Sequence, residues 1–366
     1  MALRVGVVGV GFGAAVHIPG FQSEGVEVVA VCTRRRERAE EAATRFGIPH
    51  VFTDYDEMLA MDGLDAVSIV TPVPLHHEMA LQAFDAGKHV MCEKPFTTHE
   101  HLAREMWQKA ESSGLTHAVA HEFRFASGRM YVKELIDEGY IGDLRMCLMR
   151  VVGGGFRPPN VPPAQPGPQP YNPDRDSLDR GGGMLWGLGS HYIDGLRHWF
   201  GEVESVSGEL INFTPDRSSE NGVVQADADA TFFATLRFVN GGYAQIIGTR
   251  EAPFGSGATV EVYGSAGSLF TPQRGGNPPA HGIITGAKVG AAQPEPIAVP
   301  ERLQPFADDR DDRLMPFRMQ VREFVRGIET GTSPAPNFLD GYRCQQVLDA
   351  IRESSRTGCR VSISQE

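Results

Sequence analysis

The sequence predicts an α/β protein that begins with a doubly wound parallel sheet and continues into a second, more β-rich domain. Its first third alternates short β-rich runs with longer helical patterns, which is typical of parallel strands connected by helices. A glycine-rich turn follows the first apolar run, and β-rich runs succeed one another from residue 144 onward. The 366 residues, 41% of them hydrophobic, are enough for two separate cores. We therefore expect one domain over residues 1–122 and a second over residues 123–366.

Five strands and five helices are expected to alternate in the first domain. The strands are predicted at Leu3–Val8, Val26–Cys32, Ala66–Val70, His89–Cys92 and Thr116–Ala120, and the helices at Ala15–Ser23, Arg35–Phe46, Tyr55–Ala60, Leu75–Ala86 and His99–Ser113. This order predicts a ligand crevice at the carboxyl ends of the strands.

The second domain is predicted to begin with a helix and to hold an antiparallel or mixed sheet. The helix is expected at Ser127–Glu138, and the strands at Leu144–Val152, Ser205–Phe213, Thr231–Phe238, Gly242–Thr249 and Ala258–Tyr263. Asn240-Gly241-Gly242 predicts a two-residue hairpin turn. Helical spacing of apolar residues predicts two final helices, Phe317–Glu329 and Leu339–Ser354, that pack back against the rest of the molecule.

Two Pro- and Gly-rich segments, Gly153–Gly183 and Thr271–Asp308, interrupt the second domain. Loops of such length are usually lids, subunit arms or solvated excursions. We expect a lid or arm for the first, which ends at a glycine turn, and assign no function to the second.

Composition excludes several classes of protein. A formal net charge of −12 argues against a nucleic-acid surface. The five cysteines are widely spaced and form no CxxC pair, so neither a disulfide framework nor a metal site is expected. The first strand begins almost at the N-terminus and no apolar run is long enough for a membrane span, so we expect a cytoplasmic protein.

The turn Gly9-Val10-Gly11-Phe12-Gly13-Ala14 has the pattern of a dinucleotide-binding fingerprint. The first glycine permits a tight turn, the second lets the backbone approach a pyrophosphate, and a small residue at Ala14 allows a helix to pack closely on the strand. Free N–H groups at the following helix N-terminus would face the phosphates. We therefore expect Gly9, Gly11, Phe12, Gly13 and Ala14 to bind a nicotinamide cofactor.

The end of the second predicted strand distinguishes NAD from NADP. A carboxylate there binds a ribose 2′-hydroxyl, whereas basic residues accept a 2′-phosphate. The chain has Thr33-Arg34-Arg35 and no carboxylate at this position, which favours NADP over NAD. The alternative is that Arg34–Arg38 only form the exposed start of a helix, where positive charge opposes the helix dipole.

Two further motifs follow predicted strands of the same sheet. Thr71-Pro72 with His76 follows Ala66–Val70, and Glu93-Lys94-Pro95 follows His89–Cys92. The carboxyl ends of these strands border the crevice, so all of these residues are expected near the cofactor and Lys94 near the nicotinamide. A lysine there can take or donate the hydroxyl proton of a substrate, although a solvated loop lysine is the commoner role.

Together these motifs resemble the glucose-fructose oxidoreductase, inositol dehydrogenase and rhizopine-catabolism (Gfo/Idh/MocA) family. Further matching residues are Gly181-Gly182-Gly183 with His191 and Asp194, and Ser354-Ser355 in the last helix. The resemblance covers nearly the whole chain. It implies a Rossmann domain, a second domain built on a large, open, mostly antiparallel sheet, and assembly into homodimers or homotetramers. It also implies hydride transfer between a nicotinamide and a sugar or cyclitol, with Lys94 catalytic.

One position departs from the family pattern. The family usually has an Asp four residues before the histidine, where this chain has Gly187. His191 would then act with Lys94 alone or with another partner. An imidazole is suited to proton transfer near neutral pH. Asp194, on a neighbouring helical face, is expected either to orient the ring or to form a structural salt bridge.

Three other residues are candidates for the substrate pocket. Trp186 and Tyr171 have aromatic faces that can bury the C–H face of a sugar, although core packing is the commoner role. Arg124 matches an arginine that the family often has near the crevice, and a salt bridge joining the domains is the alternative.

We therefore expect an NADP-preferring oxidoreductase, with NAD as the alternative cofactor, that interconverts a secondary alcohol and a ketone on a sugar, glycoside or cyclitol. Lys94 and His191 would transfer the hydroxyl proton. Two alternatives stay open: a glycoside-cleaving enzyme that retains its cofactor and oxidises its substrate transiently, and a non-catalytic sugar or nucleotide sensor.

Overall fold

The computed structural model describes residues 2–153, 168–253, 255, 257–273 and 284–365. The chain divides into two compact units: unit 1 is Met1–Phe125 with Phe306–Gln345, and unit 2 is Ala126–Pro305 with Gln346–Glu366. Within the described residues, no helix combines the length and the apolar character that crossing a membrane requires.

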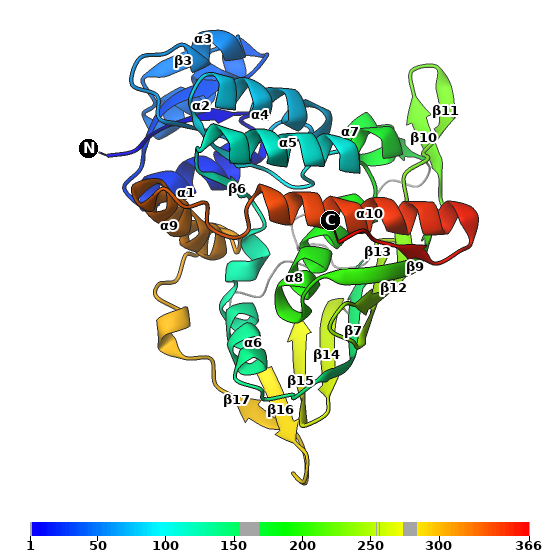
Figure 1. The fold of residues 1–366 in the computed structure, drawn as a ribbon. Helices are drawn as coiled ribbons and strands as arrows, with labels where there is room; N and C mark the ends of the chain where they lie inside the picture. The colour runs from blue at the N-terminus through cyan, green and yellow to red at the C-terminus, as the bar shows by residue number, and fades with distance from the viewer. Residues whose placement is uncertain (1, 154–167, 254, 256, 274–283, 366) are drawn as a thin grey trace. The chain divides into compact units, whose positions relative to one another are not determined.

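Unit 1 is built on a parallel sheet in the strand order β3-β2-β1-β4-β5-β6. Figure 1 labels its two edge strands, β3 and β6. The strands are β1 (Arg4–Val8), β2 (Glu27–Cys32), β3 (His50–Phe52), β4 (Ala66–Ile69), β5 (His89–Cys92) and β6 (His117–Val119). The expected Rossmann-type sheet is thus confirmed. The short strand β3 was not expected, and it lies at the edge of the sheet beside β2.

Helices cover both faces of this sheet. They are α1 (Ile18–Ser23), α2 (Arg36–Phe46), α3 (Tyr55–Leu59), α4 (His76–Asp85), α5 (Glu100–Ser113), α9 (Leu314–Thr330) and the first turns of α10 (Phe338–Thr357). One core contains Phe21 of α1 and Phe317 of α9, and the other contains Phe84 of α4 and Phe338 of α10. The predicted helix Ala15–Ser23 begins instead as a π-helical turn over Gly13–His17.

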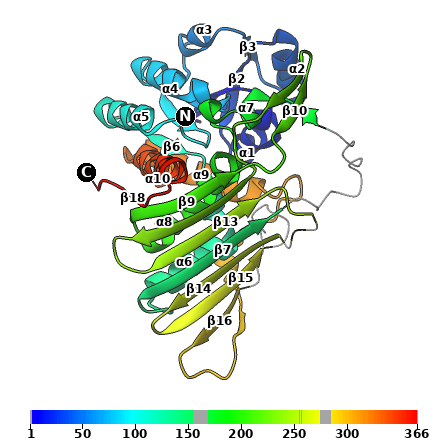
Figure 2. The same cartoon turned by 90° about the vertical axis from the view of Figure 1, so that its right-hand side faces the viewer.

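Unit 2 contains a mixed sheet in the order β17-β16-β15-β14-β7-β13-β12-β9-β18, shown face-on in Figure 2. Its strands are β7 (Leu144–Val152), β9 (Val203–Ile211), β12 (Thr231–Phe238), β13 (Tyr243–Thr249), β14 (Gly257–Gly264), β15 (Gly267–Gln273), β16 (Ile284–Lys288), β17 (Glu295–Ile297) and β18 (Val361–Ser362). All neighbouring strands are antiparallel except β7 and β13, which confirms the expected mostly antiparallel sheet.

Helices α6 (Ser127–Asp137) and α8 (Ser190–Phe200) belong to unit 2, and the buried side chains of β12 face α8. A small sheet in the order β11-β10-β8 lies apart from the large one, with β8 at Gln169–Pro170, β10 at Asp216–Ser219 and β11 at Gly222–Gln225. The connection between β12 and β13 spans residues 239–242, so the expected two-residue turn is wrong.

The two Pro- and Gly-rich segments contain more regular structure than their composition predicts. The first includes β8 and the short helix α7 (Pro173–Asp176), while its residues 154–167 lie outside the described part of the chain. The second includes β16 and β17, which extend the large sheet beyond β15. Of the readings left open for this second segment, a solvated excursion does not apply to the residues of β16 and β17.

Candidate functional site

The predicted motifs of unit 1 lie along one edge of the parallel sheet. The last residues of neighbouring strands are in register, with Val8 opposite both Cys32 and Ile69, and Cys92 opposite Ile69. Main-chain hydrogen bonds continue the register one residue further, from Gly9 N–H to Cys32 O at 2.9 Å and from Glu93 N–H to Ile69 O at 2.9 Å. The fingerprint turn, Thr33, Thr71 and Lys94 therefore follow adjacent strands at the edge where doubly wound sheets bind ligands.

The fingerprint turn has the local geometry that a pyrophosphate needs. Gly9 has a φ of 95°, and a Cβ there would lie 2.3 Å from Val70 O, so only glycine fits. A Cβ on Gly11 would have no heavy atom of the described chain within 4 Å, so the backbone is open to a ligand. A Cβ on Gly13 would lie 3.1 Å from Val7 Cγ1, so the helix start packs closely on β1 at this glycine, and Ala14 packs against the same core. The residues present thus fit a bound dinucleotide.

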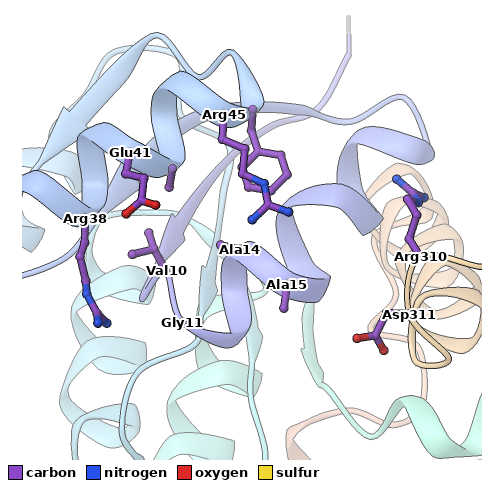
Figure 3. A pocket seen from close by; sticks show the side chains of 11 residues that line it. Val10, Gly11, Ala14, Ala15, Arg38, Glu41, Arg45, Arg310 and Asp311 are labelled. Atoms are coloured by element: carbon purple, nitrogen blue, oxygen red, sulfur yellow. The ribbon is translucent and has the colours of Figure 1, made fainter. Parts of the chain in front are cut away.

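A pocket of about 410 Å³ lies beside this turn (Figure 3). Its lining comes from the fingerprint, from α2 and from the segment before α9: Val10, Gly11, Ala14, Ala15, Arg38, Glu41, Ala42, Arg45, Phe46, Arg310 and Asp311. Arg38 extends from α2 along the side that Val10 and Gly11 line. Thr33 is half-buried and Arg34 is exposed just before α2. The sequence identified Arg38 only as part of a helix start.

Lys94 is half-buried and follows β5, and its peptide bond to Pro95 is cis. The Lys94 N–H donates to Glu93 Oε2 at 3.0 Å. The other oxygen, Oε1, lies 2.8 Å from His17 Nε2, and His17 Nδ1 lies 2.7 Å from Ser68 Oγ. Neither His17 nor Ser68 belongs to a motif that is recognisable in the sequence.

Glu122, which follows β6, is a second buried carboxyl group near Glu93 and Lys94. Burial is the main cause that raises the pKa of Glu122 to about 8, and the charge of Glu93 adds to it while Lys94 and Arg313 oppose it. Glu122 is therefore mostly protonated at pH 7. The guanidinium of Arg313, at the start of α9, also lies over the ring of Phe12, 4.7 Å from its centroid.

His76 connects two of the turns at this edge. Its Nε2 lies 2.8 Å from Thr71 O, and its Nδ1 lies 3.1 Å from Pro95 O. Burial is the main cause that lowers the pKa of His76. A neutral ring has one N–H, so His76 donates to one of these two carbonyl oxygens while it lies between the Thr71-Pro72 turn and the Lys94-Pro95 turn.

Arg124 is buried and lies in the 3₁₀ turn Glu122–Phe125 that follows β6. Its Nη2 donates to Asp340 Oδ1 at 2.8 Å, and both residues belong to unit 1. This ion pair therefore lies within one unit, and a contact of Arg124 with substrate stays a prediction.

The expected proton-transfer residues of unit 2 lie on and before α8. His191 and Asp194 are both buried in the first turns of this helix. A Cβ at Gly187 would have no heavy atom of the described residues within 4 Å, so the position where the family pattern has a carboxylate is open. Lys94 belongs to unit 1 and His191 to unit 2, and their convergence stays a prediction.

The turn before α8 is held by a residue that sequence analysis did not identify. Asp229 Oδ2 accepts the Leu185 N–H at 3.0 Å, and Asp229 O accepts the Met184 N–H at 3.0 Å. A Cβ at Gly183, where φ is 103°, would lie 2.2 Å from Asp229 Oδ1. The glycine turn therefore allows Asp229 to approach the backbone that leads to His191.

The two aromatic candidates differ in exposure. Trp186 is fully buried, and the guanidinium of Arg352 lies 5.2 Å from the centre of its ring. Tyr171, just after β8, is 37% exposed. Trp186 packs in the core, as its commoner role predicts, and substrate contacts of both residues stay predictions.

Comparison with known proteins covers both units. Residues 3–121 match the model of an oxidoreductase family with an NAD-binding Rossmann fold, and residues 130–270 match the model of the Gfo/Idh/MocA C-terminal domain. An uncharacterised oxidoreductase of Synechocystis sp. is 32% identical, over 96% of this chain and 94% of that protein.

Two similar proteins have stated activities. Levoglucosan dehydrogenase of Pseudarthrobacter phenanthrenivorans is 27% identical over 99% of this chain and 98% of that protein. D-xylose 1-dehydrogenase (NADP(+)) 2 of Haloferax volcanii is 26% identical over 99% of this chain and 100% of that protein. A solved structure of levoglucosan dehydrogenase in complex with NADH and L-sorbose has a TM-score of 0.87 at 24% identity, covers 100% of both chains, and shows the same fold.

Proposed function

The chain belongs to the Gfo/Idh/MocA family of NAD(P)-dependent oxidoreductases, and from this premise we propose that it is an NADP-preferring enzyme that interconverts a secondary alcohol and a ketone on a sugar, glycoside or cyclitol. The family and its relatives identify it as an oxidoreductase that acts on CH–OH groups of sugars. One observation carries the finer proposal: Lys94 follows β5 at the sheet edge where the open fingerprint turn follows β1.

In this proposal the chain supplies binding, orientation and proton transfer. The backbone of Gly11 and Gly13 would face the pyrophosphate of a bound dinucleotide, and Lys94, acting with His191, would accept the one proton of the substrate hydroxyl. When bound, the nicotinamide supplies the hydride chemistry. The ionised Glu93 holds the main chain of Lys94, so the Lys94 side chain extends from an anchored turn.

The test is Lys94→Ala, with Lys109→Ala as the matched control. Lys109 is a surface lysine of α5 that pairs with Asp85. Turnover of a sugar and cyclitol panel, followed by nicotinamide absorbance, should fall at least about 10²-fold in Lys94→Ala, because a general acid–base group is lost. The dissociation constant of NADPH should stay within about threefold of wild type, because phosphate contacts are untouched. Retained turnover in Lys94→Ala would contradict the assignment.

The preference for NADP is proposed from the basic residues beside the fingerprint. Arg34 is exposed before α2, and Arg38 lines the pocket. Asp54, which follows the neighbouring strand β3, accepts the Glu57 N–H at 3.1 Å and so caps α3. Two planar guanidinium groups without a carboxylate at the end of β2 favour a 2′-phosphate over a 2′-hydroxyl.

The variant Arg34→Ala/Arg38→Ala tests this preference. It should weaken NADP binding about tenfold or more and leave NAD binding nearly unchanged, because only NADP carries the 2′-phosphate. Arg36→Ala is the control, since Arg36 pairs with Glu40 at 3.7 Å on the exposed side of α2. Equal losses for both cofactors, or a wild type that favours NAD, would contradict the preference.

The same assays separate the two alternative functions. Cleavage of an aryl glycoside without added cofactor would favour the cofactor-retaining glycoside-cleaving enzyme. Tight NADP binding without hydride transfer across the panel would favour the sensor.

We further propose that a second copy of the chain covers the face of the large sheet opposite α8, the face turned to the viewer in Figure 2. Tyr243, Met146 and Phe233 are 45%, 42% and 39% exposed, and Tyr243 lies opposite Met146 in the register. Light scattering should give at least twice the mass of one chain, and Tyr243→Glu should reduce this mass.

The five free cysteines support a reducing compartment such as the cytoplasm.

A further inference from the structure

A buried chain of polar groups ends at the main chain of Lys94. Ser68 Oγ lies 2.7 Å from His17 Nδ1, His17 Nε2 lies 2.8 Å from Glu93 Oε1, and Glu93 Oε2 accepts the Lys94 N–H at 3.0 Å. Three elements contribute: the turn before α1, strand β4 and the end of β5. All of these groups belong to unit 1.

The state of Glu93 determines the direction of these hydrogen bonds. Burial by itself would raise the pKa of Glu93, but the hydrogen bond and charge of His17, with the charge of Lys94, outweigh it and lower the pKa. An ionised carboxylate only accepts hydrogen bonds, so His17 Nε2 must carry the proton that it donates to Oε1. Glu93 thus accepts one hydrogen bond at each oxygen, from His17 Nε2 at Oε1 and from the Lys94 N–H at Oε2.

The ring of His17 is itself held firmly. It packs on Phe317 with ring centroids 4.3 Å apart and meets Phe12 edge-on at 5.7 Å. The π-helical turn Gly13–His17 carries this ring into the core, where its side chain is fully buried. Turns of this kind inside helices are frequent at functional sites.

Ser68, His17 and Glu93 are the residue types of a hydrolase catalytic triad, but the burial of Ser68 excludes that role. Ser68 is fully buried within β4, so its hydroxyl cannot reach a substrate as a nucleophile requires. The hydrogen-bonded series runs from Ser68 to Glu93. Its Glu93 end lies next to the candidate site, because the following residue is the half-buried Lys94.

We propose that His17 is a positioning residue for Lys94: by donating to Glu93 Oε1 it holds the carboxylate whose other oxygen anchors the Lys94 main chain. This inference rests on the proposed function for its catalytic consequence. Its structural part, the anchoring of Lys94 by His17 through Glu93, can be tested without turnover.

The experiment compares His17→Phe with wild type. Phenylalanine keeps a ring against Phe317 but removes both hydrogen bonds. Exchange of the Lys94 amide hydrogen should accelerate at least about tenfold. Glu93 loses the hydrogen bond from His17 that holds its carboxylate in place, and the hydrogen bond that protects the Lys94 N–H is weakened as a result. The amide protection of β1, which lacks these contacts, serves as the internal reference for folding. His50→Phe, at the exposed start of β3, is the matched control and should leave Lys94 exchange unchanged.

Turnover provides the second measurement. In His17→Phe, kcat should fall about 10- to 100-fold, as for other partners that orient a functional side chain, while the KM for NADP changes less than about threefold. His17→Gln offers Glu93 one amide donor and should restore slow Lys94 exchange and part of kcat. A merely structural role would lower stability without this split between kcat and KM.

The outcomes are distinguishable. Unchanged Lys94 exchange in His17→Phe overturns the inference, whatever the activity. A wild type that turns over no sugar refutes the proposed function and leaves the exchange result to decide the anchoring. If His17→Phe does not fold, Ser68→Ala takes its place: Lys94 exchange about two- to fivefold faster supports the inference, and unchanged exchange overturns it.

Discussion

Replacing Asp229 with asparagine is expected to change how the stability of unit 2 depends on pH. Asp229 is 2% exposed, and Oδ2 accepts the Leu185 N–H at 3.0 Å. Its Oδ1 is buried and has no hydrogen-bond partner among the described residues. Burial raises the pKa of Asp229 from its ordinary 3.8 to about 6, although the Leu185 N–H and the charge of Arg250 oppose this rise. The folded protein therefore binds this proton more tightly than the unfolded chain does.

The sign and size of the effect follow from this pKa. The folded state retains the proton between pH 3.8 and about 6, where the unfolded state has already lost it. The stability that Asp229 contributes is therefore complete below pH 3.8 and falls as the pH rises to about 6. A pKa difference of about 2 corresponds to about 3 kcal/mol, and about 1 kcal/mol of it develops between pH 5 and 7. Asparagine does not titrate, so Asp229→Asn lacks this loss.

Urea unfolding at several pH values between 5 and 8 measures the effect. Tryptophan fluorescence in a Trp107→Phe background follows unit 2, because Trp186 and Trp199 both belong to it. The free energy of unfolding of Asp229→Asn minus that of the parent should grow by about 1 kcal/mol between pH 5 and 7, and change little above pH 7. The exposed Asp227, which accepts the Leu178 N–H at 2.9 Å, provides the control Asp227→Asn, whose difference should stay constant. A difference for Asp229→Asn that stays constant or shrinks as the pH rises would refute the reasoning.

Two pairs of glycine substitutions test the packing. Gly20→Ala should lower the free energy of unfolding in urea by about 1–3 kcal/mol, because its Cβ would lie 2.5 Å from Phe317 Cδ1. Gly195→Ala should instead stabilise α8 by about 0.5–1 kcal/mol, because the nearest atom to its Cβ would be 3.9 Å away. Equal effects of the two substitutions would contradict this packing. Gly187→Asp should leave the thermal midpoint within about 2 °C of wild type because its Cβ enters open space. Gly189→Ala should lower the midpoint more than Gly187→Asp does, since its Cβ would lie 3.1 Å from a leucine methyl and a phenylalanine ring, and the reverse order would contradict the open space at Gly187.

Most of the parallel sheet could be predicted because its signals are local. The apolar runs of β1, β2, β4 and β5 are long enough to show their burial, and turn residues separate them from the helices. Strand β3 could not be predicted in this way. It has only three residues, none of them fully buried, and it pairs on one side only, with β2.

In the large sheet, two strands could not be predicted from local sequence. Strand β16 contains Gly286 and β17 contains Pro296, residues that disfavour strands on their own. They form strands because β16 pairs with β15, which places Gly286 opposite Leu269. Pairing between strands overrides the local preference of these residues for turns and loops. The sequence of residues 271–308 therefore does not predict β16 and β17.

The candidate site divides in the same way. The fingerprint, Thr33 and Glu93-Lys94 were recognisable because each motif is a short run next to a strand end. His17 and Asp229 were not, because their partners are distant: Ser68 is 51 residues from His17, Glu93 is 76 residues away, and Leu185 is 44 residues from Asp229. The one sign in the sequence was a histidine on an otherwise apolar helix start, four residues after Gly13.

The sequence by itself determined the parallel sheet, the open glycine turn and the lysine at the sheet edge, because each depends on conformational preferences and periodicity within about ten residues. Only the tertiary structure decided which polar groups become buried together, such as His17 with Glu93 and Asp229 with the turn before α8. Burial and hydrogen-bond distance depend on strand register and on packing between segments far apart in the chain. No local sequence pattern encodes the burial or the hydrogen-bond distances of these groups, although both determine the charge state of Glu93 and Asp229.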